Sequence, residues 1–145
     1  MPFGMPPITD FCFLVEDVER SVAFYRDKLG FALRTKAEGF ADFKTEHVAF
    51  ALWEIDHIAK TVGISNQRAA PGVHKSIGAI ELKRPEEIDV LYEKLVARGV
   101  SFISPPKDYP WQARCVYFAD PDDYIWEIYS WLDELGGKRF GEVTE

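Results

Sequence analysis

The stretch FADPDDYIWEIY, residues 118–129, predicts a tight turn between two strands and decides the fold. The turn is expected at Asp120-Pro121-Asp122-Asp123, because Asp side chains bond to nearby backbone amides and Pro fixes φ. The residues after it are rich in aromatic and β-branched types, as strands are. Glu127 is therefore expected in a strand that directly follows the turn.

The residues before this turn predict a strand, a helix and two further strands. Pro85 suits the first position of the helix, and Gly99 suits its end. Four apolar residues recur at helical spacing between them and are expected to form the buried stripe: Ile88, Leu91, Tyr92 and Leu95. The strands predicted in this half of the chain span residues 76–82, 100–103, 113–118 and 124–131.

The first half of the chain repeats this order of elements. Asp17 is expected to cap a helix that ends at Gly30. The spacing from Gly30 to Gly99 is nearly the spacing from Val15 to Leu82, where the opening strands end. The strands predicted here span residues 8–15, 31–35, 40–43 and 48–53. We therefore predict two βαβββ modules.

These modules are expected to form one domain over residues 1–145. Module one covers about 8–55 and module two about 76–131. A polar linker, 56–75, lies between them, with a short helix expected at 58–62. The tail, 132–145, has little apolar content and is expected to fray.

Composition indicates an ordinary globular protein. The chain has 145 residues, of which 47% are hydrophobic and 28% charged, and its net charge is −7. No basic cluster indicates nucleic acid, and no run approaches the roughly 20 apolar residues that span a membrane. The N-terminal residues do not resemble a signal peptide, so a cytoplasmic protein is expected. Cys12 and Cys115 are predicted to be buried thiols.

Two stretches together resemble a known family. FLVEDVERSVAFY, residues 13–25, closes at Lys28-Leu29-Gly30-Phe31, and FADPDDYIWEIY follows in the second half. They resemble the glyoxalase / bleomycin-resistance / extradiol-dioxygenase family, the vicinal oxygen chelate superfamily, over roughly residues 8–129. The resemblance implies an α+β fold in which two βαβββ modules form a curved sheet or half-barrel. It also implies a homodimer.

Members of that family usually hold a divalent metal on His and Glu side chains. Glu127 matches the Glu of the second module, and Asp10 stands where the first His lies. Ile77 and Ala51 replace the other two ligands, and neither side chain can bind a metal. The chain's histidines, at 47, 57 and 74, do not fall at ligand positions. We therefore predict no metal and no other cofactor, with Mg²⁺ or Mn²⁺ on the two carboxylates as the alternative.

Strand parity places several side chains on faces that the resemblance directs towards one cleft. Small residues leave room there, and Trp111, in a loop, offers a stacking surface. Gln112 stands where relatives carry Gly. The predicted ligand-binding residues are Asp10, Cys12, Ala51, Trp53, Ile77, Trp111 and Glu127, and Glu127 is the predicted catalytic residue. The alternatives are a solvated Glu127, alanines that accommodate Trp53, and a dimer contact at Trp111.

Three functions are compatible with these residues. The first is a metal-free protein of the bleomycin-resistance type that binds a small organic molecule, planar and bearing a polar or cationic group. The second is an enzyme of the glyoxalase-type lyase or isomerase class, or one related to dioxygenases, with Glu127 or Asp10 as base. The third is a partner-binding domain without a site. Loss of the His positions favours the first, and the retained Glu127 argues against the third.

Overall fold

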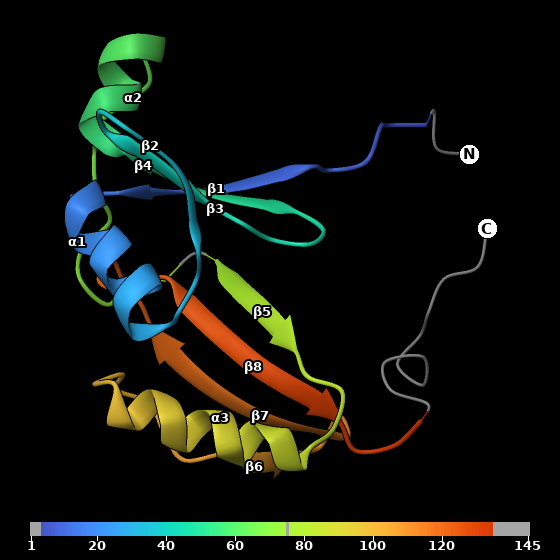
Figure 1. Ribbon diagram of the computed structural model, residues 1–145. Helices are drawn as coiled ribbons and strands as arrows, with labels where there is room; N and C mark the ends of the chain where they lie inside the picture. The colour runs from blue at the N-terminus through green and yellow to red at the C-terminus, as the bar shows by residue number, and fades with distance from the viewer. Residues whose placement is uncertain (1–3, 75, 135–145) are drawn as a thin grey trace. The chain divides into compact units, whose positions relative to one another are not determined.

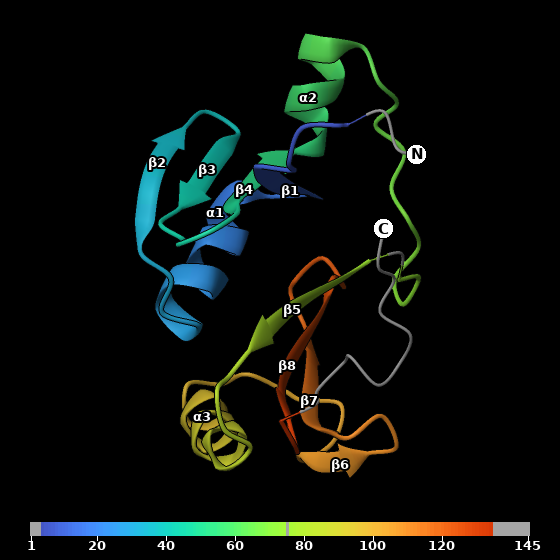
Figure 2. The ribbon, with the colours of Figure 1, turned by 90° about the vertical axis from the view of Figure 1, so that its right-hand side faces the viewer.

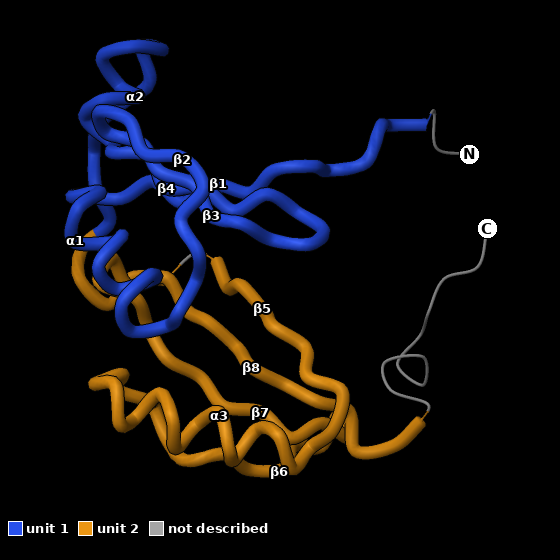
Figure 3. The backbone as a smooth tube through the Cα atoms, viewed as in Figure 1, with its two compact units in different colours: residues 1–69 blue, residues 70–145 orange. Residues whose placement is uncertain are grey.

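A computed structural model describes residues 4–74 and 76–134 of the chain. It contains two compact units, residues 1–69 and residues 70–145, which Figure 3 shows in different colours. Each unit is described by itself below. No helix in the described ranges is long and apolar enough to cross a membrane. The boundaries predicted for the modules and for a single domain stay predictions.

Unit 1 holds a four-stranded mixed sheet, sheet A, in the order β1-β4-β3-β2 (Figure 1). The parallel pair β1–β4 is followed by antiparallel pairs. Its elements are β1 (Asp10–Val15), α1 (Val18–Val22), a π-helical continuation (Ala23–Lys28), β2 (Leu33–Ala37), β3 (Phe40–Phe43), β4 (Ala49–Glu54) and α2 (Ile55–Val62). The helix expected at 58–62 therefore begins three residues earlier.

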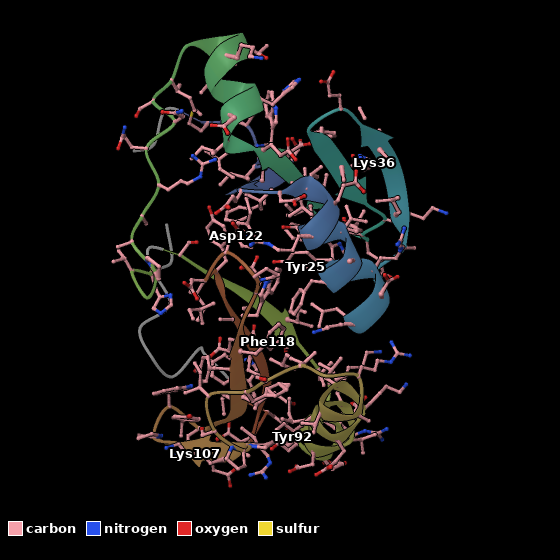
Figure 4. The ribbon with its side chains drawn as sticks, turned by 90° about the vertical axis from the view of Figure 1, so that its left-hand side faces the viewer. Tyr25, Lys36, Tyr92, Lys107, Phe118 and Asp122 are labelled. Atoms are coloured by element: carbon pink, nitrogen blue, oxygen red, sulfur yellow. The ribbon has the colours of Figure 1, made fainter. Side chains whose placement is uncertain are left out.

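The first helix starts and ends at the residues that the sequence indicates. The Asp17 carboxylate accepts hydrogen bonds from the backbone N–H groups of Glu19 and Arg20, which confirms it as the cap. Gly30 follows the helix with φ of +85°, a conformation that favours glycine. The helix buries Tyr25 against aromatic rings of the sheet; Tyr25 is labelled in Figure 4.

Unit 2 repeats this topology in sheet B, whose strand order is β5-β8-β7-β6. Again one parallel pair, β5–β8, is followed by two antiparallel pairs. Its elements are β5 (Ile77–Glu81), α3 (Glu86–Ala97), β6 (Lys107–Tyr109), β7 (Ala113–Ala119) and β8 (Ile125–Trp131). The matching order of the two sheets confirms the predicted α+β fold of repeated modules.

Helix α3 covers one face of sheet B (Figure 2). Ile88 and Leu95 from the helix are buried together with Val116, Phe118 and Ile128 from the sheet. Tyr92 on α3 and Phe118 on β7, both labelled in Figure 4, enclose a third ring, that of Phe102. On strand β5, a Cβ on Gly78 would lie 2.8 Å from the Trp126 ring, so the packing of that ring over the strand favours glycine there.

Two features of unit 2 differ from the sequence-based expectation. Residues 100–103 do not form a strand; Phe102 makes only an isolated bridge to Phe118. The edge strand is instead β6, after Pro105 and Pro106. The apolar run at 100–103 resembles a strand in sequence, but its aromatic residue packs against α3, whereas β6 is short and polar. Pro85 lies just before α3 rather than inside it.

The turn at Asp120–Asp123 forms as predicted. The Asp120 Oδ1 atom accepts the backbone N–H groups of Asp122 and Tyr124. Asp123 has φ of +65°, a left-handed conformation that Asp adopts more readily than most residues other than glycine. Its carboxylate also accepts the Gly72 N–H at 3.1 Å and so ties the preceding loop to the turn. Of the predicted tail, residues 135–145 lie outside the described ranges.

Candidate functional site

Sheet B has a second face, opposite α3, that carries most of the candidate residues of unit 2. Successive strand residues point to opposite faces. Arg114 on β7 bonds to Asp89 on α3, so its side chain points towards the helix. Cys115 and Tyr117, which alternate with it along the strand, point to the opposite face. We call this the α3-distal face. Register places the following residues on it: Ile77, Ala79, Glu81, Cys115, Tyr117, Glu127 and Tyr129.

Glu127 is at the centre of this face. It pairs in register with Ala79 on β5 and with Tyr117 on β7. The Tyr117 hydroxyl donates a hydrogen bond to Glu127 Oε2 at 2.5 Å. Burial raises the pKa of Tyr117 well above its ordinary value, and the hydrogen bond to Glu127 raises it further. Tyr117 is therefore a protonated donor at neutral pH.

A second tyrosine–carboxylate pair lies beside the first. The Tyr129 hydroxyl is 3.3 Å from Glu81 Oε1 across the parallel pair of strands. Burial raises the pKa of Tyr129, and the Glu81 charge adds to the effect. The buried Cys115 pairs in register with Tyr129. Burial raises its thiol pKa, partly offset by hydrogen bonding with Trp111, so Cys115 is not an activated nucleophile.

Aromatic rings from β6 and the following turn lie next to Tyr117, the hydrogen-bond partner of Glu127. The rings of Tyr109 and Trp111 stack with centroids 4.7 Å apart and planes at 18°. Tyr109 also meets Tyr117 edge-on at 5.8 Å. The ammonium of Lys107 lies 5.0 Å from the Tyr109 centroid, within the range of a cation–π contact. Trp111 is still 38% exposed, which leaves ring surface for a ligand.

The turn that carries Trp111 depends on its next residue. Gln112 has φ of +65°, the left-handed conformation that favours glycine. Its N–H donates to the Tyr109 carbonyl, and its own carbonyl accepts the Leu132 N–H. These two bonds offset the cost of that conformation, typically about 1 kcal/mol for a residue with a side chain.

Sequence reasoning did not single out Tyr109 or Tyr117 as site residues. Tyr117 could have been found, because the two strands around the turn at 120–123 form a hairpin. Once the hairpin register is set, Tyr117 lies opposite Glu127. Tyr109 gave no such signal, because the strand that holds it was not predicted.

The remaining candidates lie together on one face of sheet A in unit 1. Cys12 pairs in register with Ala51, and Ala51 pairs with Asp42. Asp10 lies two residues before Cys12 on the same edge strand. Cys12 is exposed, which corrects the prediction of a buried thiol. The protein packed around the rest of its side chain still raises the thiol pKa to about 11.

This face of sheet A differs from the α3-distal face in where its carboxylate lies. Ala51 occupies the β4 position that corresponds to Glu127 on β8, and the neighbouring strand supplies Asp42 instead. Asp42 is almost buried and forms a two-pronged ion pair with Arg34. Hydrogen bonding by Arg34 lowers the pKa of Asp42. The negative charge of Asp42 is therefore already paired with the positive charge of Arg34.

Trp53 is held in place on the same sheet. Its indole N–H donates to His57 Nδ1 at 2.9 Å, and its ring meets Phe40 edge-on. The imidazole of His57 packs over Gly39, where an added Cβ would lie 2.9 Å away. Trp53 thus offers a ligand its half-buried ring but not its N–H donor.

The side chains at the family's metal positions do not fit a metal centre. Ile77 and Ala51 carry no donor atom, and one oxygen of Glu127 already accepts from Tyr117. The histidines do not compensate: His57 is bonded to Trp53, His74 Nδ1 lies 2.7 Å from the Asp123 carbonyl, and His47 is exposed. Within residues 4–74 and 76–134, no three His, Cys, Asp or Glu side chains form a group able to hold a metal ion.

The chain is similar to known proteins in sequence and in fold. The model of the Glyoxalase/Bleomycin resistance protein/Dioxygenase superfamily matches residues 8–128, so the chain belongs to that superfamily. The crystal structure of a glyoxalase/bleomycin resistance protein/dioxygenase from Nocardioides matches this fold with a TM-score of 0.89. The two sequences are 42% identical, and the match covers 99% of this chain and 93% of that one.

Curated relatives match over most of their length. An uncharacterized protein, YraH, of Bacillus subtilis (strain 168) is 32% identical over 123 residues, 82% of this chain and 94% of YraH. A bleomycin resistance protein of Geobacillus stearothermophilus is 30% identical over 114 residues, 77% of this chain and 86% of that protein. These likenesses confirm the family that the sequence resembles; they do not test the individual site residues.

Proposed function

We propose that the protein binds a small organic molecule on the α3-distal face, with Glu127 as its polar anchor and without a metal. The observation that carries this proposal is the Tyr117–Glu127 hydrogen bond beside the stacked rings of Tyr109 and Trp111. A fixed carboxylate next to exposed aromatic surface is what a planar ligand with one polar group requires. Similarity to a bleomycin resistance protein supports the same class.

The charge of the face favours a ligand with a cationic group. Glu81 and Glu127 lie on adjacent strands, and each accepts a hydrogen bond from a tyrosine. The aromatic faces attract cations too, as the position of Lys107 over Tyr109 illustrates. A net charge of −7 acts in the same direction. Ile77, at the end of β5 and 53% exposed, adds apolar surface.

The predicted residues of sheet A take a secondary place in this proposal. Asp10 keeps an exposed carboxylate, and Ala51 leaves room beside Cys12. The ring of Trp53 can contact an apolar part of a ligand. We propose these residues as ligand contacts on their own face of sheet A, and Glu127 as the residue of the α3-distal face whose loss matters most.

A binding experiment tests the proposal. Planar cations such as 1-methylquinolinium are titrated against the protein while tryptophan fluorescence is recorded. Replacing Trp111 by Ala should weaken binding by about 0.5–1.5 kcal/mol, the size of an aromatic contact. Val90→Ala, an exposed apolar residue on α3, is the control and should change nothing. Equal affinity in the wild-type protein and the Trp111→Ala variant would exclude this face.

A metal measurement tests the metal-free part of the proposal. The purified protein is dialysed against Zn²⁺, Ni²⁺, Mn²⁺ or Fe²⁺ and analysed for bound metal. We expect no stoichiometric metal, because two ligand positions have no donor atom. About one ion per chain, lost in Glu127→Ala, would contradict this and favour the enzyme alternative.

The alternative function is catalysis by a lyase, isomerase or dioxygenase-related enzyme, with Glu127 as general base. The orientation of Glu127 by Tyr117 supports it, because a base must be fixed relative to its substrate. The two functions differ in what is recovered after long incubation with a bound ligand. Unchanged ligand favours binding alone, whereas a product that Glu127→Gln fails to form favours catalysis.

A further inference from the structure

The hydroxyl of Tyr117 is hydrogen-bonded to Glu127, the anchor of the proposed site. It donates to Glu127 Oε2 at 2.5 Å, and its strand pairs directly with the strand of Glu127. An ionised carboxylate has about four acceptor sites, so one bond from Tyr117 leaves capacity for a ligand. The bond fixes one oxygen and thereby orients the other.

Tyr117 is itself well fixed. It lies on β7, between β8 and β6, and pairs with Glu127 across the hairpin. The ring of Tyr109 meets it edge-on at 5.8 Å. A side chain held on two sides can restrain its partner, because little conformational entropy remains to be lost on binding.

We infer that Tyr117 is a positioning residue that orients the Glu127 carboxylate towards the cationic group of a ligand. This inference rests on the proposed function of the α3-distal face. Tyr117 orients the charged carboxylate of Glu127, so its hydroxyl should affect the binding of a cation more than the binding of a neutral molecule of the same shape. A residue that only supported the fold would affect both alike.

Two probes of matched shape separate these roles: 1-methylquinolinium, a planar cation, and 1-methylnaphthalene, its neutral counterpart. Tyr117→Phe removes the hydroxyl and keeps the ring. We expect it to weaken binding of the cation about tenfold, since without the hydrogen bond from Tyr117 the Glu127 carboxylate is no longer held towards the cationic group, and to change binding of the neutral probe less than about twofold. Tyr92→Phe, on helix α3, which packs against the other face of the sheet, is the matched control.

A double-mutant cycle completes the test. Glu127→Gln keeps an acceptor for the tyrosine but removes the charge, and in that background Tyr117→Phe should no longer alter the preference for the cation. If Tyr117→Phe weakens both probes equally, or neither, the inference is overturned while the proposed function stands. If the wild-type protein binds neither probe, both are overturned. Thermal unfolding of each variant identifies a misfolded protein. If Tyr117→Phe is misfolded, Tyr117→Met, which also lacks the hydroxyl, replaces it in the same comparison of the two probes.

Discussion

At the scale of single residues, the two cysteines have environments that their sequence context does not distinguish. Both lie in apolar strands, yet Cys115 is buried and Cys12 is exposed. Cys12 is nevertheless surrounded closely enough that its pKa is raised to about 11. Exposure and reactivity are therefore separate properties here, because the thiolate is the reactive form.

This separation predicts slow alkylation of Cys12. In a Cys115→Ser variant treated with iodoacetamide at pH 8, we expect a rate on the order of a hundredfold below that of a free cysteine with a pKa of about 8.5. The rate should rise with pH until about pH 11, since the thiolate is populated only as pH approaches the pKa. Mass spectrometry follows the reaction, and a plateau below pH 9 would contradict the expectation.

Asp123 shows how one side chain can serve a strained turn. It has φ of +65° and its carboxylate accepts the Gly72 N–H. Asp123→Ala keeps the strain and loses the bond, so it should destabilise the protein by about 1–2 kcal/mol. Asp123→Gly loses the same bond but relieves the strain, so it should cost less. Urea unfolding measures both, and equal losses would show that the backbone conformation contributes nothing.

At the scale of elements, β2 and β3 are joined by an ion pair whose two partners differ in exposure. The Arg34 side chain is 53% exposed and that of Asp42 only 9%. Arg34→Ala leaves a carboxylate almost buried without its partner, so we expect a loss of roughly 1–3 kcal/mol at pH 7. The double variant Arg34→Ala/Asp42→Ala should lose less than the single one. A larger loss in the double variant would contradict this account.

The same pair predicts a dependence on pH. Hydrogen bonding by Arg34 lowers the pKa of Asp42 in the folded protein, so the pair contributes fully above the unfolded value of about 4. The contribution is lost as pH falls through the lowered folded pKa. The stability difference between the wild-type protein and Arg34→Ala should therefore shrink below about pH 4. Urea unfolding at several pH values measures it, and a constant difference down to pH 2 would contradict the assignment.

Most elements were predictable because local signals and tertiary packing agree in them. The cap at Asp17, the glycine at 30 and the turn at 120–123 each combine a conformational preference with a hydrogen bond that forms. Prediction failed where packing decides. Residues 100–103 look like a strand because they are mostly apolar, but Val100 is buried and Phe102 packs against Tyr92 of α3 without forming a strand. Strand β6 pairs through its backbone without an apolar pattern.

At the scale of the whole molecule, the repeat made part of the candidate site predictable. Corresponding strands carry Ala51 and Glu127, so the sequence alone shows that the two modules differ in their acidic position. The pairing of Asp42 with Arg34 and of Glu127 with Tyr117 depends on side chains from adjacent strands. Such pairs require the register of both hairpins, which the sequence does not specify for the bulged pair β2–β3. The presence of an acidic side chain in the site could thus be predicted from the sequence, but the hydrogen-bond partner that orients it could not.

We propose that the protein forms a homodimer. Within sheet A, the edge strand β1 carries Phe11, which is 45% exposed, and Ile8 just before it is 78% exposed. Apolar side chains along a strand edge favour pairing with another chain. Light scattering coupled to gel filtration should give twice the chain mass of 16.6 kDa. A monomer mass at micromolar concentrations would contradict the proposal.

A substitution locates the proposed contact. Phe11→Asp places a charge on the β1 edge and should shift the measured mass towards the monomer, because a buried unpaired charge opposes association. Val90→Asp, at an exposed apolar position on α3, introduces the same charge on an element of unit 2 and should leave the dimer intact. If Val90→Asp dissociates the dimer and Phe11→Asp does not, the second copy binds at α3 instead.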